Sequence, residues 1–168
     1  MDDVRSLKAL ELDALREVAN IGAGHAATAL SQMTNRTIMI QVPEVNVRPL
    51  EDVPELLGAA DRVIAAVLMH MMGDLTGRTL VIFPDDSARH LCDILFRRPG
   101  GSTQAFGEME QSGLKEVGNI LVSAYLTALS DFMGMMLVPS VPSLVVDQSG
   151  AILTTTYLNF GHDRDFVF

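Results

Sequence analysis

The chain contains no tryptophan and only one cysteine, Cys92, among its 168 residues. A single cysteine cannot form a disulfide within the chain, which excludes a disulfide-stapled scaffold and suits a reducing compartment. Basic residues are also scarce, because 12 Lys and Arg stand against 21 Asp and Glu, a net charge of −9. That charge would repel a phosphate backbone or an anionic membrane surface. We therefore expect neither a nucleic-acid partner nor membrane insertion.

Long apolar runs and a basic N-terminus are missing as well. The longest apolar run, Val63–Met72, is interrupted by His70 and is too short to span a bilayer. Residues 1–3 include two Asp, whereas a secretory signal begins with basic residues. We therefore expect a cytoplasmic protein. The 48% hydrophobic content excludes a disordered chain and allows one domain with a substantial core.

The sequence resembles itself at an offset of 99 residues. Two pairs of segments align, Arg16–Ile21 with Lys115–Ile120 and Thr28–Ser31 with Thr127–Ser130. Two helices rich in Ala and Leu would not share Glu and Asn by chance, since these residues have no apolar role. We interpret residues 1–168 as a single domain made of two repeats, about 8–96 and 104–168.

Each repeat opens with a long amphipathic helix, and β-type sequence follows. Apolar residues from Leu7 to Ala29 share one broad helical face, and a second helix is expected from about Glu108 to Phe132. A short helix at 87–96 precedes a linker at 97–102. The predicted strands are 37–42, 63–72, 78–83, 135–146 and 151–160. The second repeat has no counterpart of 78–83, so we expect the natural chain to continue by about one hairpin, or this sequence to be truncated.

Each long helix carries a narrow polar stripe. Spacings of four, three and four residues place side chains on one face of a helix. The two stripes are Asp13, Glu17, Asn20 and Gly24 in the first helix, and Ser112, Glu116, Asn119 and Ser123 in the second. A solvated helix face is the simpler interpretation. However, Asn forms helices poorly, so its recurrence in the middle of both helices favours a functional role. The small fourth residue leaves room for another surface to approach the Asn.

The residue types in the stripe favour phosphoryl chemistry on a partner. No nucleophile is paired with a base, Cys92 lies in a core-like apolar segment, and the histidines lack metal-ligand spacing. An uncharged amide can hold a water in line with phosphorus without repelling the phosphoryl oxygens. A carboxylate beside it would repel those oxygens and so faces a cation on the substrate. The stripe is therefore half of an active site, and the partner brings the phosphoryl group and its metal.

These residues resemble the signature of the CheC family of chemotaxis phosphatases, which includes the CheX proteins and the phosphatase domain of FliY. The signature is Asp or Ser, three residues, Glu, two residues, Asn, and Pro 23 positions after the Asn. Two full matches are present, Asp13, Glu17, Asn20 and Pro43, and Ser112, Glu116, Asn119 and Pro142. The resemblance covers about residues 8–168.

The resemblance implies hydrolysis of the aspartyl phosphate on the response regulator CheY. Asn20 and Asn119 would orient the attacking water, and Glu17 and Glu116 would pair with a lysine of the response regulator. Asp13 and Ser112 would be auxiliary, and Pro43 and Pro142 structural, each ending a strand. The Mg²⁺ belongs to the response regulator, so no cofactor or metal of the chain's own is expected, and CheD is a second expected partner.

The same resemblance implies the fold. The expected architecture is an α/β fold of α+β type with a pseudo-two-fold duplicated unit. Two long helices would lie side by side against a mainly antiparallel sheet. This arrangement agrees with the internal repeat.

Two other functions are consistent with parts of the sequence. Gly22–Ala27 fits the GxGxxG/A dinucleotide fingerprint, with Glu44 about 20 residues on, but it follows a helix, Lys8–Ala19, whereas that fingerprint follows a strand. The stronger alternative is a non-catalytic adaptor that docks phosphorylated CheY or CheD at the chemotaxis or flagellar machinery. Two intact Glu and Asn pairs argue against it, because a docking surface does not require the amide twice.

Overall fold

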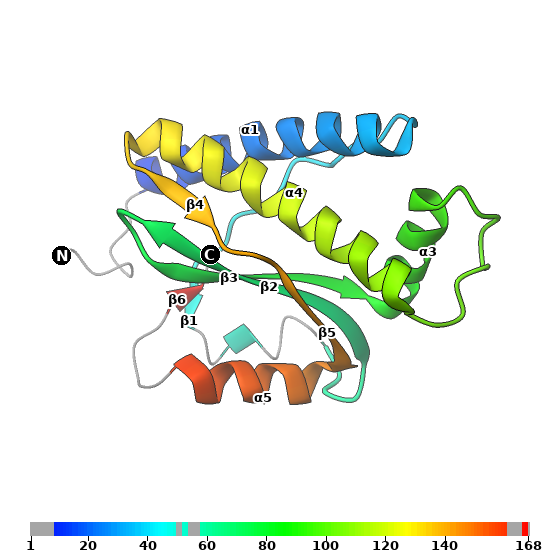
Figure 1. The fold of residues 1–168 in the computed structure, drawn as a ribbon. Helices are drawn as coiled ribbons and strands as arrows, with labels where there is room; N and C mark the ends of the chain where they lie inside the picture. The colour runs from blue at the N-terminus through cyan, green and yellow to red at the C-terminus, as the bar shows by residue number, and fades with distance from the viewer. Residues whose placement is uncertain (1–8, 50–51, 54–57, 161–165, 168) are drawn as a thin grey trace.

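Helices pack on antiparallel strands, which confirms the predicted α+β class (Figure 1). The computed structural model describes residues 9–49, 52–53, 58–160 and 166–167. Along these ranges the elements are α1 (Ala9–Thr34), β1 (Arg48–Pro49), β2 (Val63–Gly73), β3 (Gly77–Pro84), α3 (Asp85–Leu95), α4 (Glu108–Met133), β4 (Leu137–Pro139), β5 (Ser143–Gln148), α5 (Ser149–Phe160) and β6 (Phe166–Val167).

Strand β2 is the centre of the main sheet. β3 pairs antiparallel with one edge of β2, with Val67 opposite Val81. β5 and β4 pair with the other edge of β2, one after the other along its length, and Leu144 lies opposite Val67. The predicted hairpin is confirmed, since residues 74–76 join β2 to β3. Strands β1 and β6 form a separate two-stranded ladder.

The two faces of β2 are covered by different helices, as Figure 1 shows. Ala65, Val67 and Met69 alternate along the strand and pack in clusters with residues of α3 and α4. Ile64 and Ala66 point to the opposite face and pack with Ile152 of α5. This period-2 alternation with both faces buried explains why the β2 sequence reads as a nearly continuous apolar run.

Helices α1 and α4 match in length and in the geometry of their ends. Each has 26 residues, and their first and last residues are 99 positions apart. Asn35 and Gly134 follow the two helices with positive φ angles of 53° and 63°. One residue further, the Arg36 N–H donates to the Ser31 carbonyl (3.3 Å) and the Met135 N–H donates to the Ser130 carbonyl (3.2 Å). The shared sequence therefore closes the same turn twice, while the division into two repeats stays a prediction.

Two predicted strands are wrong. Residues 37–42 have no regular structure. The Ile38 N–H donates to the Ser31 hydroxyl (2.9 Å), and the side chains of Met39 and Val42 lie exposed. Residues 151–160 belong to α5, where Ile152 and Leu153 are buried. β-branched side chains favour a strand only when a neighbouring strand is there to pack against, so tertiary context decided both segments.

The predicted strand at 135–146 is divided, and the prolines explain where. β4 ends at Pro139 and β5 begins at Ser143, directly after Pro142. Proline has no N–H for a strand ladder, which accounts for the break. Pro142 therefore precedes a strand instead of ending one. Pro43 lies in a segment without regular structure, so its predicted place at a strand end is also wrong.

A buried carboxylate holds the linker that leads into α4. Asp93 of α3 accepts hydrogen bonds from the N–H groups of Gly101 (2.7 Å), Ser102 (3.2 Å) and Thr103 (2.9 Å) and from the Thr103 hydroxyl (2.6 Å). The Thr103 hydroxyl and these N–H groups stabilise the charged form, so the pKa of Asp93 is lowered although burial opposes this. Arg98 then pairs with Glu110 (2.6 Å) in the first turn of α4.

We predict that Asp93→Asn lowers the urea midpoint of unfolding at pH 7. Because the folded pKa of Asp93 is lowered, its contribution is complete above the unfolded pKa of about 4 and is lost as the pH falls through the folded value. The variant should therefore lose less stability than the wild type between pH 7 and pH 3, as measured by circular dichroism. Asp86→Asn, at an exposed position of the same helix, is the control. An unchanged midpoint at pH 7 would contradict the anchoring role.

Candidate functional site

The two stripe-bearing helices lie side by side and run antiparallel on the same side of the sheet (Figure 1). A glycine permits their close approach, since a Cβ at Gly22 would lie 3.0 Å from the Tyr125 Cα. Tyr125 is partly buried, and burial raises the pKa of its phenol. Gly22 is the first glycine of the fingerprint-like segment. Its contact with α4 gives it a packing role inside a helix, where a dinucleotide loop is not formed.

Helix α4 is held even more closely to β2. A Cβ at Gly118 would lie 2.7 Å from Val67 Cγ1, so no larger residue fits at that position without a shift. Leu114 and Val122 bury their side chains in the core on the same side of α4. Ser112 and Glu116, on the other side of the helix, are exposed, and Asn119 is half-buried.

Helix α1 has the same division between a buried and an exposed face. Val18, Ala26 and Leu30 are buried. Asp13, Glu17 and Asn20 are all exposed and follow one another along the outer side of the helix. Each helix therefore presents a polar triad to an approaching surface, in the order carboxylate or hydroxyl, carboxylate, amide.

The two triads are two separate candidate sites, because the antiparallel helices hold them apart. Asn20 lies two residues before Gly22, whereas Asn119 lies six residues before Tyr125. Because the helices are antiparallel, Asn20 and Asn119 lie on opposite sides of the contact between Gly22 and Tyr125. At a rise of about 1.5 Å per residue, the two Asn are therefore roughly 12 Å apart along the helix axes. Within the described ranges, no hydrogen bond or ion pair joins one triad to the other.

The surroundings of the two triads differ. Asp13 pairs with Arg16 at 2.8 Å, with both side chains more than half exposed, so the pair contributes little stability. In α4 the corresponding residues are Ser112 and Lys115, which cannot form this pair. The Ser123 hydroxyl donates to Asn119 Oδ1 at 3.5 Å. The corresponding residue of α1 is Gly24, which has no side chain to offer Asn20.

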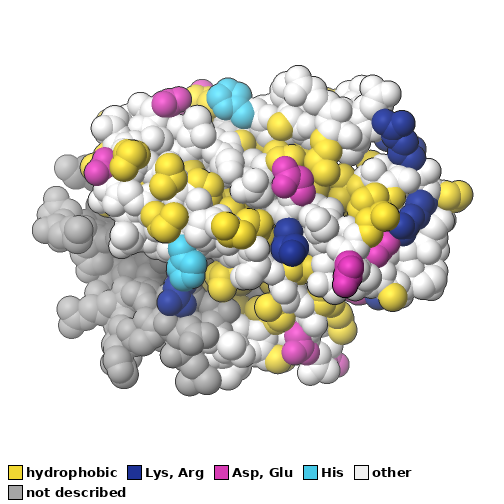
Figure 2. All heavy atoms as spheres, viewed as in Figure 1, with side chains coloured by type: hydrophobic (Ala, Val, Ile, Leu, Met, Phe, Trp, Pro, Cys, Tyr) yellow, Lys and Arg dark blue, Asp and Glu magenta, His cyan; other side chains and the backbone are white. Residues whose placement is uncertain are grey.

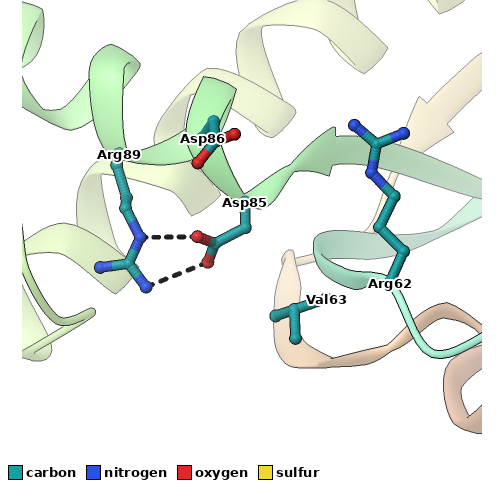
Figure 3. Close-up of a pocket in the computed structure, with 5 residues that line it drawn as sticks. All are labelled: Arg62, Val63, Asp85, Asp86 and Arg89. Atoms are coloured by element: carbon teal, nitrogen blue, oxygen red, sulfur yellow. Dashed lines mark hydrogen bonds and ion pairs between the residues drawn. The ribbon is translucent and has the colours of Figure 1, made fainter.

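Two hollows on the described part of the surface lie away from both triads. One, of about 270 Å³, is lined by Arg62, Val63, Asp85, Asp86 and Arg89 (Figure 3). The Arg89 guanidinium is already engaged, because it binds both carboxylate oxygens of Asp85 (2.7 and 3.1 Å) and also donates to the Gln104 carbonyl. Asp85 is the largest cause of the raised pKa of Arg89. Arg89 therefore connects α3 to the segment before α4, and the hollow lies beside it between the start of α3 and the start of β2.

The remaining candidate groups are also accounted for. Cys92 is fully buried, and burial together with the nearby Glu110 raises its pKa to about 11, which confirms a core position. Within the described ranges, no three His, Cys, Asp or Glu side chains gather as metal ligands. None of the helices described there is long and apolar enough to cross a bilayer. Figure 2 shows no continuous patch of Lys and Arg on the face that it displays.

Comparison with known proteins decides the family. The CheC-like family model matches residues 10–47 and 109–146, two segments 99 residues apart, and each contains one triad and its proline. The CheY-P phosphatase CheC of Bacillus subtilis is 38% identical over 156 residues, which are 92% of this chain and 75% of that protein. The chain belongs to the CheC-like family.

Solved structures similar to this CheC-like chain support the fold. FliY of Thermotoga maritima superposes with a TM-score of 0.74 at 24% identity, covering 86% of this chain and 72% of that one. The FliM middle domain of Vibrio alginolyticus gives a TM-score of 0.62 at 14% identity, covering 90% of this chain and 80% of that one. The architecture is therefore shared by proteins whose sequences have diverged widely.

Sequence reasoning missed two features of the site. The contact between Gly22 and Tyr125 depends on how the helices cross, which no pattern in one helix shows. The hydrogen bond from Ser123 to Asn119 had a signal, since residues four apart on a helix lie within reach of each other. The sequence pattern indicates only that Ser123 is small enough to leave room for a partner.

We predict opposite outcomes at two neighbouring glycines of α1. Gly22→Val drives a branched side chain into the α4 backbone and should cost about 1–3 kcal/mol of unfolding free energy. Gly24→Val is the matched control, because no atom lies within 4 Å of its Cβ position and the change should stay within about 0.5 kcal/mol. Chemical denaturation measures both. Equal effects of the two substitutions would show that Gly22 does not set the helix spacing.

Proposed function

We propose that this chain hydrolyses the aspartyl phosphate of a phosphorylated CheY-type response regulator in chemotaxis. The observation that carries the proposal is the pair of exposed Glu and Asn side chains on each of two helices, within the two segments matched by the family model. The name of the Bacillus subtilis relative, a CheY-P phosphatase, supports the same reaction.

The chemistry needs little from this chain beyond placing one water. In the proposed reaction the water oxygen attacks phosphorus while the bond from phosphorus to the aspartyl oxygen breaks. The carboxylate leaves with the bonding electron pair, and the proton released by the water ends on inorganic phosphate. Asn20 or Asn119 accepts a hydrogen bond from the water through Oδ1 and holds it in line with the leaving oxygen. Since the amide is neutral, it does not repel the phosphoryl oxygens.

The carboxylates take the docking role. Glu17 and Glu116 lie one helical turn before the two Asn and are exposed, so each can reach a lysine of the response regulator while the amide reaches the water. The response regulator supplies the Mg²⁺ that neutralises the phosphoryl group, and the chain brings no cofactor of its own. We further propose that it acts in the cytoplasm and that CheD is a second partner.

An adaptor that only docks the phosphorylated regulator is the second candidate. The fold alone does not separate the two functions, since a FliM domain shares it. The Glu and Asn pairs favour hydrolysis, because a neutral amide can position a water beside a docking carboxylate, and docking alone would not require the amide in both helices. Binding to the phosphorylated receiver without acceleration of its hydrolysis would support the adaptor.

We predict that Asn20→Ala combined with Asn119→Ala slows dephosphorylation of a Mg²⁺-loaded CheY-type receiver by about a hundredfold or more. Each single substitution leaves one amide in place and should retain part of the activity. The measurement is loss of acyl phosphate with time. Gln32→Ala, which removes an exposed amide of α1 outside the triad, is the control. Full activity of the double variant would refute the role of the amides.

We predict a different signature for Glu17→Gln combined with Glu116→Gln. The substitutions keep the shape and remove the charge, so the KM for the receiver should rise by about tenfold while kcat changes less. The dependence of KM on salt should also weaken, because an ion pair is screened and a neutral contact is not. Asp131→Asn, an exposed acid elsewhere on α4, serves as control. A fall in kcat at constant KM would assign the carboxylates to the chemical step.

A further inference from the structure

The amides of the two triads are held differently. Asn119 is half-buried and accepts a hydrogen bond from the Ser123 hydroxyl at 3.5 Å. Asn20 is exposed, and no hydrogen bond from another described residue holds its side chain. The difference follows from one substitution between the helices, Ser123 in α4 against Gly24 in α1.

The hydrogen bond leaves the reactive part of the Asn119 amide free. Oδ1 has two lone pairs, so it can accept from Ser123 and still accept from a water. The Ser123 hydroxyl lies at the outer limit of hydrogen-bond distance, and together with the partial burial of Asn119 it restricts the torsions of that side chain before any partner arrives. Asn20 has to lose that freedom when the partner binds or in the transition state, and ordering a side chain at that moment costs free energy.

We propose that Ser123 is a positioning residue for Asn119, and that the α4 site therefore turns over faster than the α1 site. This inference rests on the proposed function. The structure also has room for the reciprocal substitution, Gly24→Ser, because no atom lies within 4 Å of the Cβ position of Gly24. A serine there has room to place its hydroxyl against Asn20 as Ser123 does against Asn119.

Two single-site chains separate the helices. Asn20→Ala leaves the α4 site and Asn119→Ala leaves the α1 site, and kcat and KM are measured with the phosphorylated receiver. The α4 site should have the higher kcat by about threefold to tenfold, the range expected for ordering one side chain. In the Asn20→Ala chain, Ser123→Ala should remove this advantage at nearly constant KM, and Ser123→Thr, which keeps the hydroxyl, should preserve it. Equal kcat values for the two sites, or an effect of Ser123→Ala on KM alone, would overturn the proposal.

The gain-of-function arm uses the α1 site. In the Asn119→Ala chain, Gly24→Ser should raise kcat by about threefold to tenfold. Gly24→Ala is the matched control, because it improves helix propensity without adding a hydroxyl. A gain with alanine equal to that with serine would attribute the effect to helix stability and contradict positioning.

An NMR measurement on the free protein separates this inference from the proposed function. The side-chain amide of Asn119 should show a higher order parameter than that of Asn20, and Ser123→Ala should lower it. Equal order parameters would overturn the role of Ser123 whatever the activity. If neither single-site chain accelerates dephosphorylation, the proposed function is wrong, and so is the predicted difference in turnover. The order parameters still test whether Ser123 positions Asn119.

Discussion

The close contact between Gly118 of α4 and Val67 of β2 is the constraint on which the rest of the structure depends. Glycine in the middle of a helix costs about 0.5–1 kcal/mol relative to alanine, yet any Cβ here would lie 2.7 Å from Val67. The contact fixes which side of α4 faces the sheet and so which side carries Glu116 and Asn119. Gly22 then sets α1 against Tyr125 in the same way. Two glycines thus orient both polar triads.

The exposed position of the triads suits a site that is completed by a partner. An enzyme with a complete site encloses its substrate in a cavity lined by convergent groups. Here Glu17 and Asn20 lie on the outer side of a helix, and the hollow at Arg89 lies elsewhere, between the start of α3 and the start of β2. In the proposed function, such a surface would place a carboxylate and an amide inside another protein's site, and the other protein would contribute the phosphoryl group and the metal.

Much of this could be predicted from the sequence, and the failures share a cause. The long helices, β2 and β3 followed from periodicity, and the stripe residues followed from spacing on a helix. The strand predictions for residues 37–42 and 151–160 are wrong because neither segment pairs with a neighbouring strand, and strand pairing depends on the tertiary structure. For the same reason, the contacts of Gly22 and Gly118 were beyond prediction, since they join elements far apart in the chain.

The most direct test of this account is a multiple-turnover assay with the wild-type chain. A CheY-type receiver is phosphorylated in Mg²⁺, and the loss of its acyl phosphate is followed with a small fraction of one equivalent of the chain. We expect each chain to dephosphorylate many receivers and to release inorganic phosphate. If the chain binds the phosphorylated receiver but leaves its rate of decay unchanged, the central claim is contradicted.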